Sequence, residues 1–141
     1  MIASNGVAAR KSVAVIAIVV VGLIVYLNSF DNSFHFDDEH SILENPHIRD
    51  LGNIPRFFID VGAFSGLDEA KMYRPLLVLS FAVNYALGGY EIFGYHVVNL
   101  FLHICNALLL WLLACRLGMM PAAALSAALC FVAHPLGTEP V

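Results

Sequence analysis

The chain has 141 residues, of which 60% are hydrophobic and 13% are charged, and its mean hydropathy is +0.78. A soluble domain usually carries a charge on about a quarter of its residues, so this composition argues against a soluble enzyme and favours an integral membrane protein. The formal net charge is −4, and no basic stretch stands out. Nucleic acid is therefore excluded as a partner.

The first apolar segment covers residues 12–30, and its central run, Ser12–Leu27, contains no charged residue. Arg10 and Lys11 end a short N-terminal segment, residues 1–11, and give the run the charge pattern of a signal sequence or a signal anchor. The residues after the run lack a small-x-small cleavage pattern. We therefore predict an uncleaved transmembrane helix, which needs about 20 residues to cross the hydrocarbon core.

Residues 31–93 are predicted to form a polar loop that contains short helices of its own. Ten of the eleven acidic residues lie here against four bases, which gives the loop a formal charge of −6. Proline and glycine positions predict surface or re-entrant helices at about 38–47, 55–61 and 75–87. The last of these is apolar but too short to span a membrane, and a helix buried in a hairpin is the alternative.

Residues 94–115 form the clearest spanning segment. Its polar members recur at spacings of three or four residues: His96, Asn99, His103 and Asn106. A polar stripe on a spanning helix faces the bundle interior or a water-filled cavity, so it predicts either interhelical hydrogen bonds or a cavity wall near a substrate. A turn at 116–120 leads to a third helix at 121–135, and residues 136–141 begin a second loop.

The positions of the basic residues predict the topology, because basic loops stay in the cytoplasm. Arg10, Lys11 and Arg116 would be cytoplasmic, so the loop at 31–93 would be external and the third helix would return the chain to the same external side. The predicted fold class is therefore an all-α integral membrane protein. It has three transmembrane helices plus short membrane-surface helices in the first external loop.

Three adjacent acids, Asp37, Asp38 and Glu39, lie just beyond the first apolar segment and are flanked by His35 and His40. Neighbouring carboxylates repel one another, which raises the pKa of one of them and suits it to act as a general base. Alternatively, the same oxygen atoms would bind a hard divalent cation. A plain solvated acidic loop is the third interpretation of this pattern.

Three further residues are candidates on the same external side of the membrane. Arg74 precedes Pro75 and would serve either as a clamp on an anion or as an arginine that reaches the membrane surface. His134 and Glu139 follow the third helix in a stretch that contains two prolines. A helix end followed by a tight loop is the alternative explanation for that stretch.

Four stretches occur in an order that resembles the N-terminal part of one family. That family is the transmembrane and tetratricopeptide-repeat O-mannosyltransferases and their bacterial relatives, which are GT-C-type polytopic glycosyltransferases. The stretches are FDDEHSILENPHI at 36–48, YRPLLVLSFAVNYALGG at 73–89, GYHVVNLFLH at 94–103 and HPLGTE at 134–139. Together they span about 105 residues, which makes the resemblance specific.

The resemblance implies a reaction and a set of site residues. A polyprenyl- or dolichyl-phosphate donor would pass a mannose-like sugar to a hydroxyl of a protein or glycan acceptor within membrane lipids. Asp37 and Asp38 would be catalytic acids, and Glu139 would support them. Arg74, His134 and His96 would bind substrate. No metal ligand is assigned, although a divalent cation is compatible with the site.

The chain departs from the family pattern in two ways. Gly137 stands where the family usually has histidine, and the further spans and the repeat array of the family are missing from the 141 residues. We therefore expect a truncated N-terminal piece that is inactive alone, in a bacterial inner membrane rather than the endoplasmic reticulum. The alternative is a non-catalytic membrane protein, or a truncated pseudo-enzyme, that acts as an assembly partner.

Overall fold

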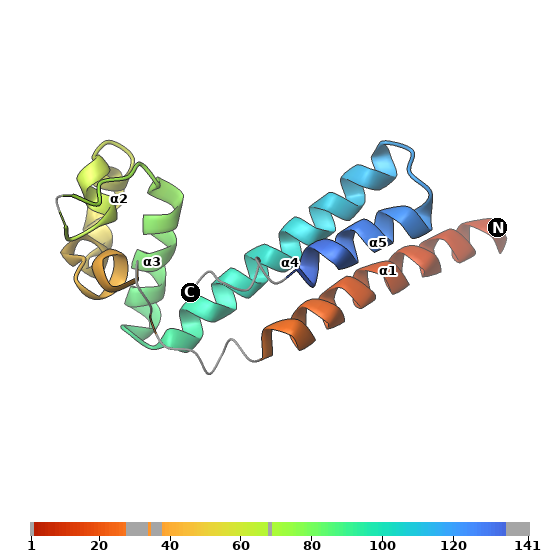
Figure 1. Cartoon of the computed structure of the whole chain (residues 1–141), viewed down its shortest axis with the longest axis horizontal. Coiled ribbons are helices and arrows are strands. Elements are labelled where there is room, and N and C mark those ends of the chain that lie inside the picture. Colours follow the sequence, from red (N-terminus) through yellow and green to blue (C-terminus); the bar gives the residue numbers. More distant parts are fainter. Residues whose placement is uncertain (1, 28–33, 35–37, 68, 135–141) are drawn as a thin grey trace. The chain divides into compact units, whose positions relative to one another are not determined.

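The computed structural model describes residues 2–27, 34, 38–67 and 69–134, with side chains from residue 11 onward. It is all-helical over these residues, as the sequence predicts, and no strand occurs among them. The chain divides into two compact units (Figure 1). We call residues 1–31 with 99–140 the long-helix unit, and residues 32–98 the loop unit.

The long-helix unit contains α1 (Ile2–Tyr26), most of α4 (Ile92–Arg116) and α5 (Pro121–Val132). Its core is rich in alanine, which lets helix backbones approach closely. The buried members are Ala14, Ile18, Ala107, Trp111, Ala114, Ala124, Ala128 and Val132. The close packing extends to Gly22, where an added Cβ would lie 2.9 Å from a side-chain carbon of Ile104.

His103 on α4 contacts both other helices of the long-helix unit. Its Nε2 donates a hydrogen bond to the carbonyl oxygen of Val132 on α5 at 3.2 Å. Its ring centroid lies 5.1 Å from those of Tyr26 on α1 and Phe131 on α5. For His103, the prediction of interhelical hydrogen bonding is therefore confirmed, whereas Asn106 of the same stripe is exposed.

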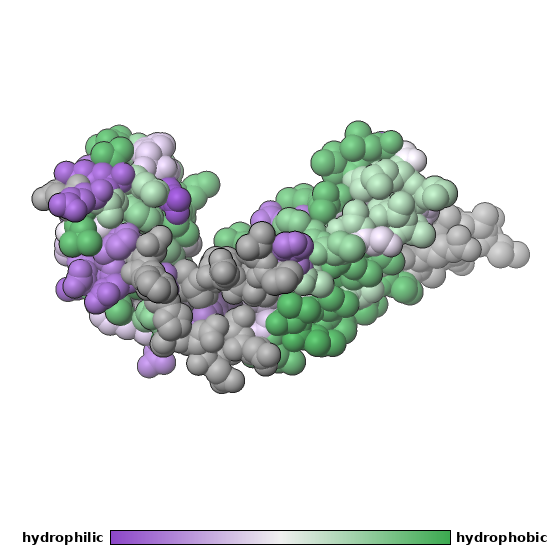
Figure 2. Space-filling model, viewed as in Figure 1, coloured by the Kyte–Doolittle hydropathy of each residue, from purple (hydrophilic) through white to green (hydrophobic). Residues whose placement is uncertain are grey.

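The outer surface of the long-helix unit is apolar. Large side chains such as Val13, Ile24, Phe101 and Leu109 are each more than half exposed, and Figure 2 shows apolar residues over much of the visible face of α4, α5 and α1. Among the described residues, α4 is the one helix long and apolar enough to cross a membrane. Its 25 residues extend about 37 Å. The apolar parts of the two other helices, Lys11–Tyr26 and Pro121–Val132, are shorter.

The loop unit is built from short helical turns that surround one longer helix. The turns are a π-helix η2 (Glu39–Leu43), 3-10 helices η3 (Pro46–Arg49), η4 (Leu51–Asn53) and η5 (Val61–Phe64), and an α-helix α2 (Ile54–Phe57). The helix expected at about 38–47 is thus split at Asn45, and the one expected at 55–61 is replaced by two shorter turns. The longer helix α3 (Pro75–Gly88) begins and ends almost where the sequence predicts.

Polar side chains start three of these turns. The side-chain oxygens of Asn45, Asp50 and Asp60 accept hydrogen bonds of 2.8–2.9 Å from the backbone N–H two residues later. Such a bond satisfies an amide that the first turn of a helix leaves unpaired. Two of the acids in the loop are therefore helix caps.

Helix α3 is the core helix of the loop unit. Val78, Phe81 and Ala82 are buried on its inner face against the short turns, in a cluster with Phe57 and Tyr95. Gly89 ends α3 with a positive φ of 63°, a conformation that glycine adopts without steric cost. Of the two interpretations of this segment, the structure favours a helix buried in a hairpin, although Leu76 and Leu87 on its other side are exposed.

The fully buried Asn45 joins the two halves of the short-turn region. Its side-chain NH₂ group donates to the carbonyl oxygens of Ser41, Ala63 and Phe64 at 3.0–3.2 Å. The two backbone segments that Asn45 joins also meet at Gly66, where an added Cβ would lie 2.5 Å from the carbonyl oxygen of Glu44. Residues 41–45 and 63–66 are therefore held at backbone contact.

We predict that Asn45→Ala destabilises the loop unit by about 3 kcal/mol, because it leaves buried backbone carbonyls without donors. Hydrogen exchange of the backbone amides at 41–66, measured on the full chain by mass spectrometry, should show this loss of protection. Asn53→Ala is the matched control, since Asn53 makes one part-buried bond to the His47 carbonyl. Equal protection in both variants would contradict the role assigned to Asn45.

Candidate functional site

Of the two described residues of the acidic cluster, Asp38 and Glu39, Asp38 is the buried one. It is 6% exposed, whereas the next residue, Glu39, is exposed and begins η2. Its side chain does not cap that turn. Carboxylates are seldom buried without a role or a partner. A solvated acidic loop therefore does not describe Asp38.

The segment that follows Asp38 is fixed by residues 65–67. Nδ1 of His40 lies 3.1 Å from the Ser65 hydroxyl, which also accepts a hydrogen bond from the Leu67 N–H at 2.9 Å. The Gly66 N–H donates to the His40 carbonyl oxygen at 2.9 Å. Side chain and backbone thus both attach the acidic segment to the turn after η5.

Phe64 brings Arg74 into contact with the same region. The guanidinium carbon of Arg74 lies 5.5 Å from the centroid of the Phe64 ring, which is cation–π distance. The other partner of that ring is His40, whose centroid is 6.2 Å away in an edge-on arrangement. A cation and the residue two positions after Asp38 therefore share one aromatic ring, although they are 34 positions apart in sequence.

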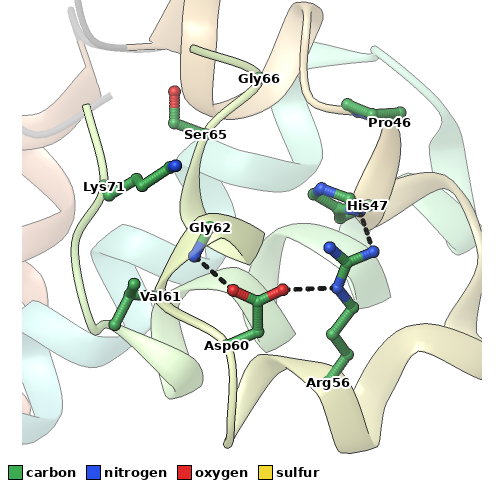
Figure 3. Close-up of a pocket in the computed structure, with 9 residues that line it drawn as sticks. All are labelled: Pro46, His47, Arg56, Asp60, Val61, Gly62, Ser65, Gly66 and Lys71. Carbon is green, nitrogen blue, oxygen red and sulfur yellow. Dashed lines mark hydrogen bonds and ion pairs between the residues drawn. The ribbon is translucent and has the colours of Figure 1, made fainter. Parts of the chain in front are cut away.

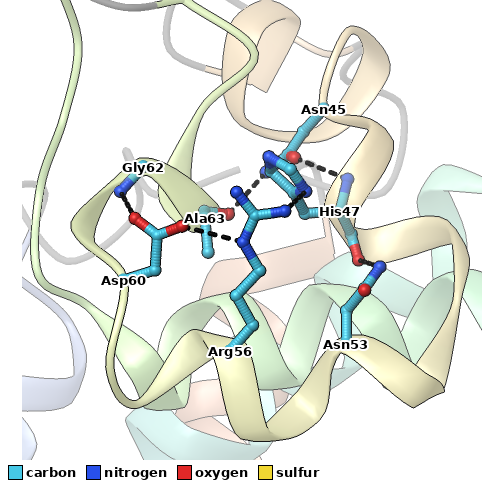
Figure 4. A network of polar contacts seen from close by, with 7 residues as sticks. All are labelled: Asn45, His47, Asn53, Arg56, Asp60, Gly62 and Ala63. Carbon is cyan, nitrogen blue, oxygen red and sulfur yellow. Dashed lines mark hydrogen bonds and ion pairs between the residues drawn. The ribbon is translucent and has the colours of Figure 1, made fainter.

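A chain of polar contacts runs through η3, α2 and the start of η5 (Figure 3). Nε of Arg56 donates to Oδ2 of Asp60 at 2.8 Å, and Nη1 of Arg56 lies 3.4 Å from Nδ1 of His47. The Gly62 N–H donates to the other oxygen of Asp60. Figure 4 shows this chain beside Asn45 and Asn53, whose side chains hold the backbone around His47.

These contacts shift the acid–base properties of two groups. The hydrogen bonds from Arg56 and from the Gly62 N–H hold the pKa of Asp60 below its usual value. Partial burial and the positive charge of Arg56 lower the pKa of His47, against a smaller opposing effect of Asp60. At neutral pH, His47 is therefore uncharged, and its Nδ1 accepts the hydrogen bond from Arg56.

The structure places the other predicted site residues as follows. His96 is buried at 4% exposure in the first part of α4, within the loop unit. His134 is exposed just after α5, in the long-helix unit. Asp37 and Glu139 lie outside the described residues, so their convergence with Asp38 stays a prediction. Within the described part of the chain, no group of three His, Cys, Asp or Glu residues is placed to hold a metal ion.

Sequence reasoning missed the residues that organise this region. Phe64 and Ser65 were not singled out, although they contact Arg74 and His40. Arg56 and Asp60 are four residues apart, a spacing that predicts an ion pair on one helical face. The repeated Asp-x-Gly pattern was the available signal for the capped turns.

Comparison with known proteins finds several protein O-mannosyl-transferases among the relatives of the chain. The chain is 34% identical to the human Protein O-mannosyl-transferase TMTC4 over 84% of this chain and 18% of that protein. It is 35% identical to Protein O-mannosyl-transferase Tmtc1 of Drosophila melanogaster over 86% of this chain and 14% of the relative. For Protein O-mannosyl-transferase tmtc2 of Xenopus laevis the identity is 36%, over 86% and 15%.

The chain thus spans less than a fifth of the length of these curated relatives. No protein-family model matches it. No solved structure matches it either.

We predict that acidification weakens the loop unit through His47. Its pKa in the folded protein is lowered from 6.5, so the unfolded chain binds the proton more readily. The stabilising contribution is complete above about pH 6.5 and is lost as the pH falls through the pKa of the folded state. NMR titration of the histidine rings in the full chain should give His47 a pKa below 6.5.

The predicted loss of stability of the loop unit at low pH can be tested against control variants. Between pH 7.5 and pH 5.5, hydrogen-exchange protection of the loop unit should fall more in the wild type than in His47→Gln. The exposed His134 provides the comparison, and His134→Gln should behave like the wild type. A normal or raised pKa for His47 would contradict the partial burial of its ring beside Arg56.

Proposed function

The chain belongs to the TMTC family of protein O-mannosyl-transferases, and we propose that it forms part of an integral membrane glycosyltransferase. The proposed enzyme transfers mannose to a hydroxyl of a protein acceptor. The observation that carries the proposal is the shared contact at Phe64, which links the cation of Arg74 to the segment that begins at the buried Asp38. A base and a cation in one region are what sugar transfer from a phosphate requires.

We propose a polyprenyl- or dolichyl-phosphate sugar as the donor. In this reaction the acceptor hydroxyl attacks the anomeric carbon, a new C–O bond forms, and the bond to the lipid phosphate breaks. The proton of the hydroxyl passes to a carboxylate, and the negative charge of the leaving phosphate is balanced by a nearby cation. Asp38, together with Asp37, fits the first role, and Arg74 fits the second because a guanidinium matches phosphate geometry.

The remaining predicted residues take supporting roles in this proposal. Glu139 would assist the acids, and His134 and His96 would contact substrate. A divalent cation is compatible with the reaction but is not required by any residue described. His96 is buried, so its side chain lies within packed structure rather than on a solvated surface.

The proposal includes a membrane location with three spanning helices and an external loop. The length and apolarity of α4 support it, as do the exposed apolar side chains of the long-helix unit. The short turns of the loop unit would lie at the membrane surface. The relatives named above come from animals, so the preference for a bacterial inner membrane over the endoplasmic reticulum finds no support.

We predict that Asp38→Asn lowers mannose transfer by about 100-fold or more, since a general base contributes about 10²–10⁴ to a rate. Transfer of radiolabelled mannose from dolichyl-phosphate mannose would be measured in membranes that carry the full product of the gene. Glu39→Gln is the matched control, because Glu39 is adjacent but exposed, and it should retain transfer.

If the Asp38→Asn variant retains mannose transfer, Asp38 is not the general base of the reaction. Helicity and hydrogen exchange would show whether that variant is folded. If the wild-type protein inserts and folds but transfers no sugar, the alternative of a non-catalytic membrane protein is supported instead.

We also predict the sidedness of the loop unit. A reporter enzyme fused after Lys71 should register an external position, and one fused after Arg116 a cytoplasmic position. If the Lys71 fusion is cytoplasmic, Asp38 and Arg74 are on the wrong side to meet the residues that follow α5.

A further inference from the structure

A pocket of about 370 Å³ opens on the loop unit, and no role has been assigned to it above. Its walls come from η3, from α2 and the turn after it, and from residues 65–66 and Lys71. Figure 3 shows Arg56 and Asp60 side by side in one wall, with His47 and Lys71 at different sides of the pocket. Folding brings these segments together, because they are separate in sequence.

The charged groups of this lining already have partners. Nε of Arg56 and Oδ2 of Asp60 form an ion pair at 2.8 Å, so these two charges balance each other. Lys71 has an interaction of its own. His47 is neutral at pH 7, because partial burial and the nearby guanidinium lower its pKa. The lining is therefore polar without requiring a ligand that carries a charge.

Hydrogen-bonding capacity remains on both members of the ion pair. Each oxygen of Asp60 accepts one hydrogen bond, from Arg56 or from the Gly62 N–H, whereas a carboxylate can accept about four. Within the described part of the chain, Nη2 of Arg56 makes no hydrogen bond, so the guanidinium keeps donors for a ligand. Because Nδ1 of His47 accepts from Arg56, its Nε2 carries the proton and is a further donor.

Donors and acceptors thus lie next to each other in fixed positions. Asp60 is held by the Gly62 N–H, and the guanidinium of Arg56 is held by both Asp60 and His47. A hydroxyl group donates one hydrogen bond and accepts others. Two neighbouring hydroxyls of a sugar ring can therefore donate to the carboxylate and accept from the guanidinium. Groups that are already in place bind with a smaller entropic cost than mobile ones.

The size and the apolar content of the pocket agree with such a ligand. Its volume is at the low end of the range for small-molecule sites, which suits one sugar ring. Pro46 and Val61 are the apolar side chains of the described lining, so a lipid chain finds little surface there. We infer that this pocket binds a neutral sugar and holds two neighbouring hydroxyls of its ring between Arg56 and Asp60.

The pocket lies beside the segment of the proposed general base. Ser65 is part of its wall, and the Ser65 hydroxyl lies 3.1 Å from Nδ1 of His40, two positions after Asp38. The lining offers little to a lipid chain, so we assign the pocket to a sugar already attached to an acceptor protein rather than to the lipid-linked donor. This assignment of the source rests on the proposed function, whereas sugar binding itself does not.

The test uses saturation-transfer difference NMR on the full chain in micelles of a phosphocholine detergent, which carries no sugar. Methyl α-mannoside should bind with a dissociation constant in the millimolar range, because a few hydrogen bonds to neutral groups bind weakly. Methyl 3-O-methyl-α-mannoside lacks every pair of neighbouring free hydroxyls and should bind at least tenfold more weakly. Equal binding of the two sugars would overturn the proposal. Displacement of methyl α-mannoside by inorganic phosphate would assign the pocket to an anion and would also overturn it.

Variants locate the binding in this pocket. Arg56→Lys keeps the positive charge but loses the fork of donors, and Asp60→Asn keeps one oxygen for the Gly62 N–H but loses the carboxylate. Each should weaken methyl α-mannoside about tenfold. Arg49→Lys is the matched control and should bind normally, because Arg49 is exposed in the same unit and donates to the Leu43 carbonyl outside the pocket.

Hydrogen exchange at residues 41–66 shows whether each variant is folded. If Arg56→Lys disturbs the fold, Asp60→Asn decides the matter, and unchanged affinity in a folded Asp60→Asn variant contradicts the proposal.

A second pair of ligands tests the source of the sugar. A short peptide with an α-mannosyl serine should displace methyl α-mannoside, whereas the same peptide with unmodified serine should not. If neither peptide displaces the bound sugar, the assignment to a mannosylated acceptor is wrong. All of these measurements omit the lipid donor, so a failure of sugar transfer and a failure of sugar binding are distinguishable.

Discussion

The structure of the loop unit depends on the buried side-chain amide of Asn45. Its NH₂ group donates to carbonyls at 41, 63 and 64, and its oxygen accepts from the His47 N–H. An amide that is hydrogen-bonded at every atom replaces the backbone pairing that a sheet or long helix would otherwise supply. Four short turns and a π-helix can therefore pack as one unit although none of them would be stable alone. Both the segment after Asp38 and the pocket around Arg56 take their positions from this contact.

The acids of the loop divide into different physical roles. Asp50 and Asp60 cap helical turns, and Asp60 also fixes Arg56, so their charges stabilise local structure. Asp38 is buried and does not cap the turn that follows it. A loop that is rich in acidic residues can therefore contain only a few carboxylates that take part in function. Burial, rather than the number of acids, distinguishes Asp38 as the residue to test.

Local signals predicted the longer helices α3, α4 and α5 well, and predicted the short turns of the loop unit less well. Prolines at 46, 55, 75 and 121 lie in the first turns of helical elements, and Gly89 ends α3, because these residues restrict or free the backbone over a few positions.

The same local rules failed where distant segments meet. Asn45 before a proline indicated only a helix boundary, and its bonds to residues 63 and 64 depend on the complete fold. The contact of Phe64 with Arg74 and the pocket between η3 and residue 71 were unpredictable for the same reason. On α4, periodicity grouped four polar residues, but His96 packs in the loop unit and His103 bonds to α5.

The most direct test of the central role of Asn45 is the exchange rate of its side-chain amide protons. This rate would be measured by NMR on the isotopically labelled full chain in micelles, together with nuclear Overhauser contacts to residues 63 and 64. The structure predicts slow exchange and contacts to both residues, because the group is fully buried and donates to three carbonyls. Exchange as fast as that of an exposed asparagine, without those contacts, would contradict the fold of the loop unit and the site built on it.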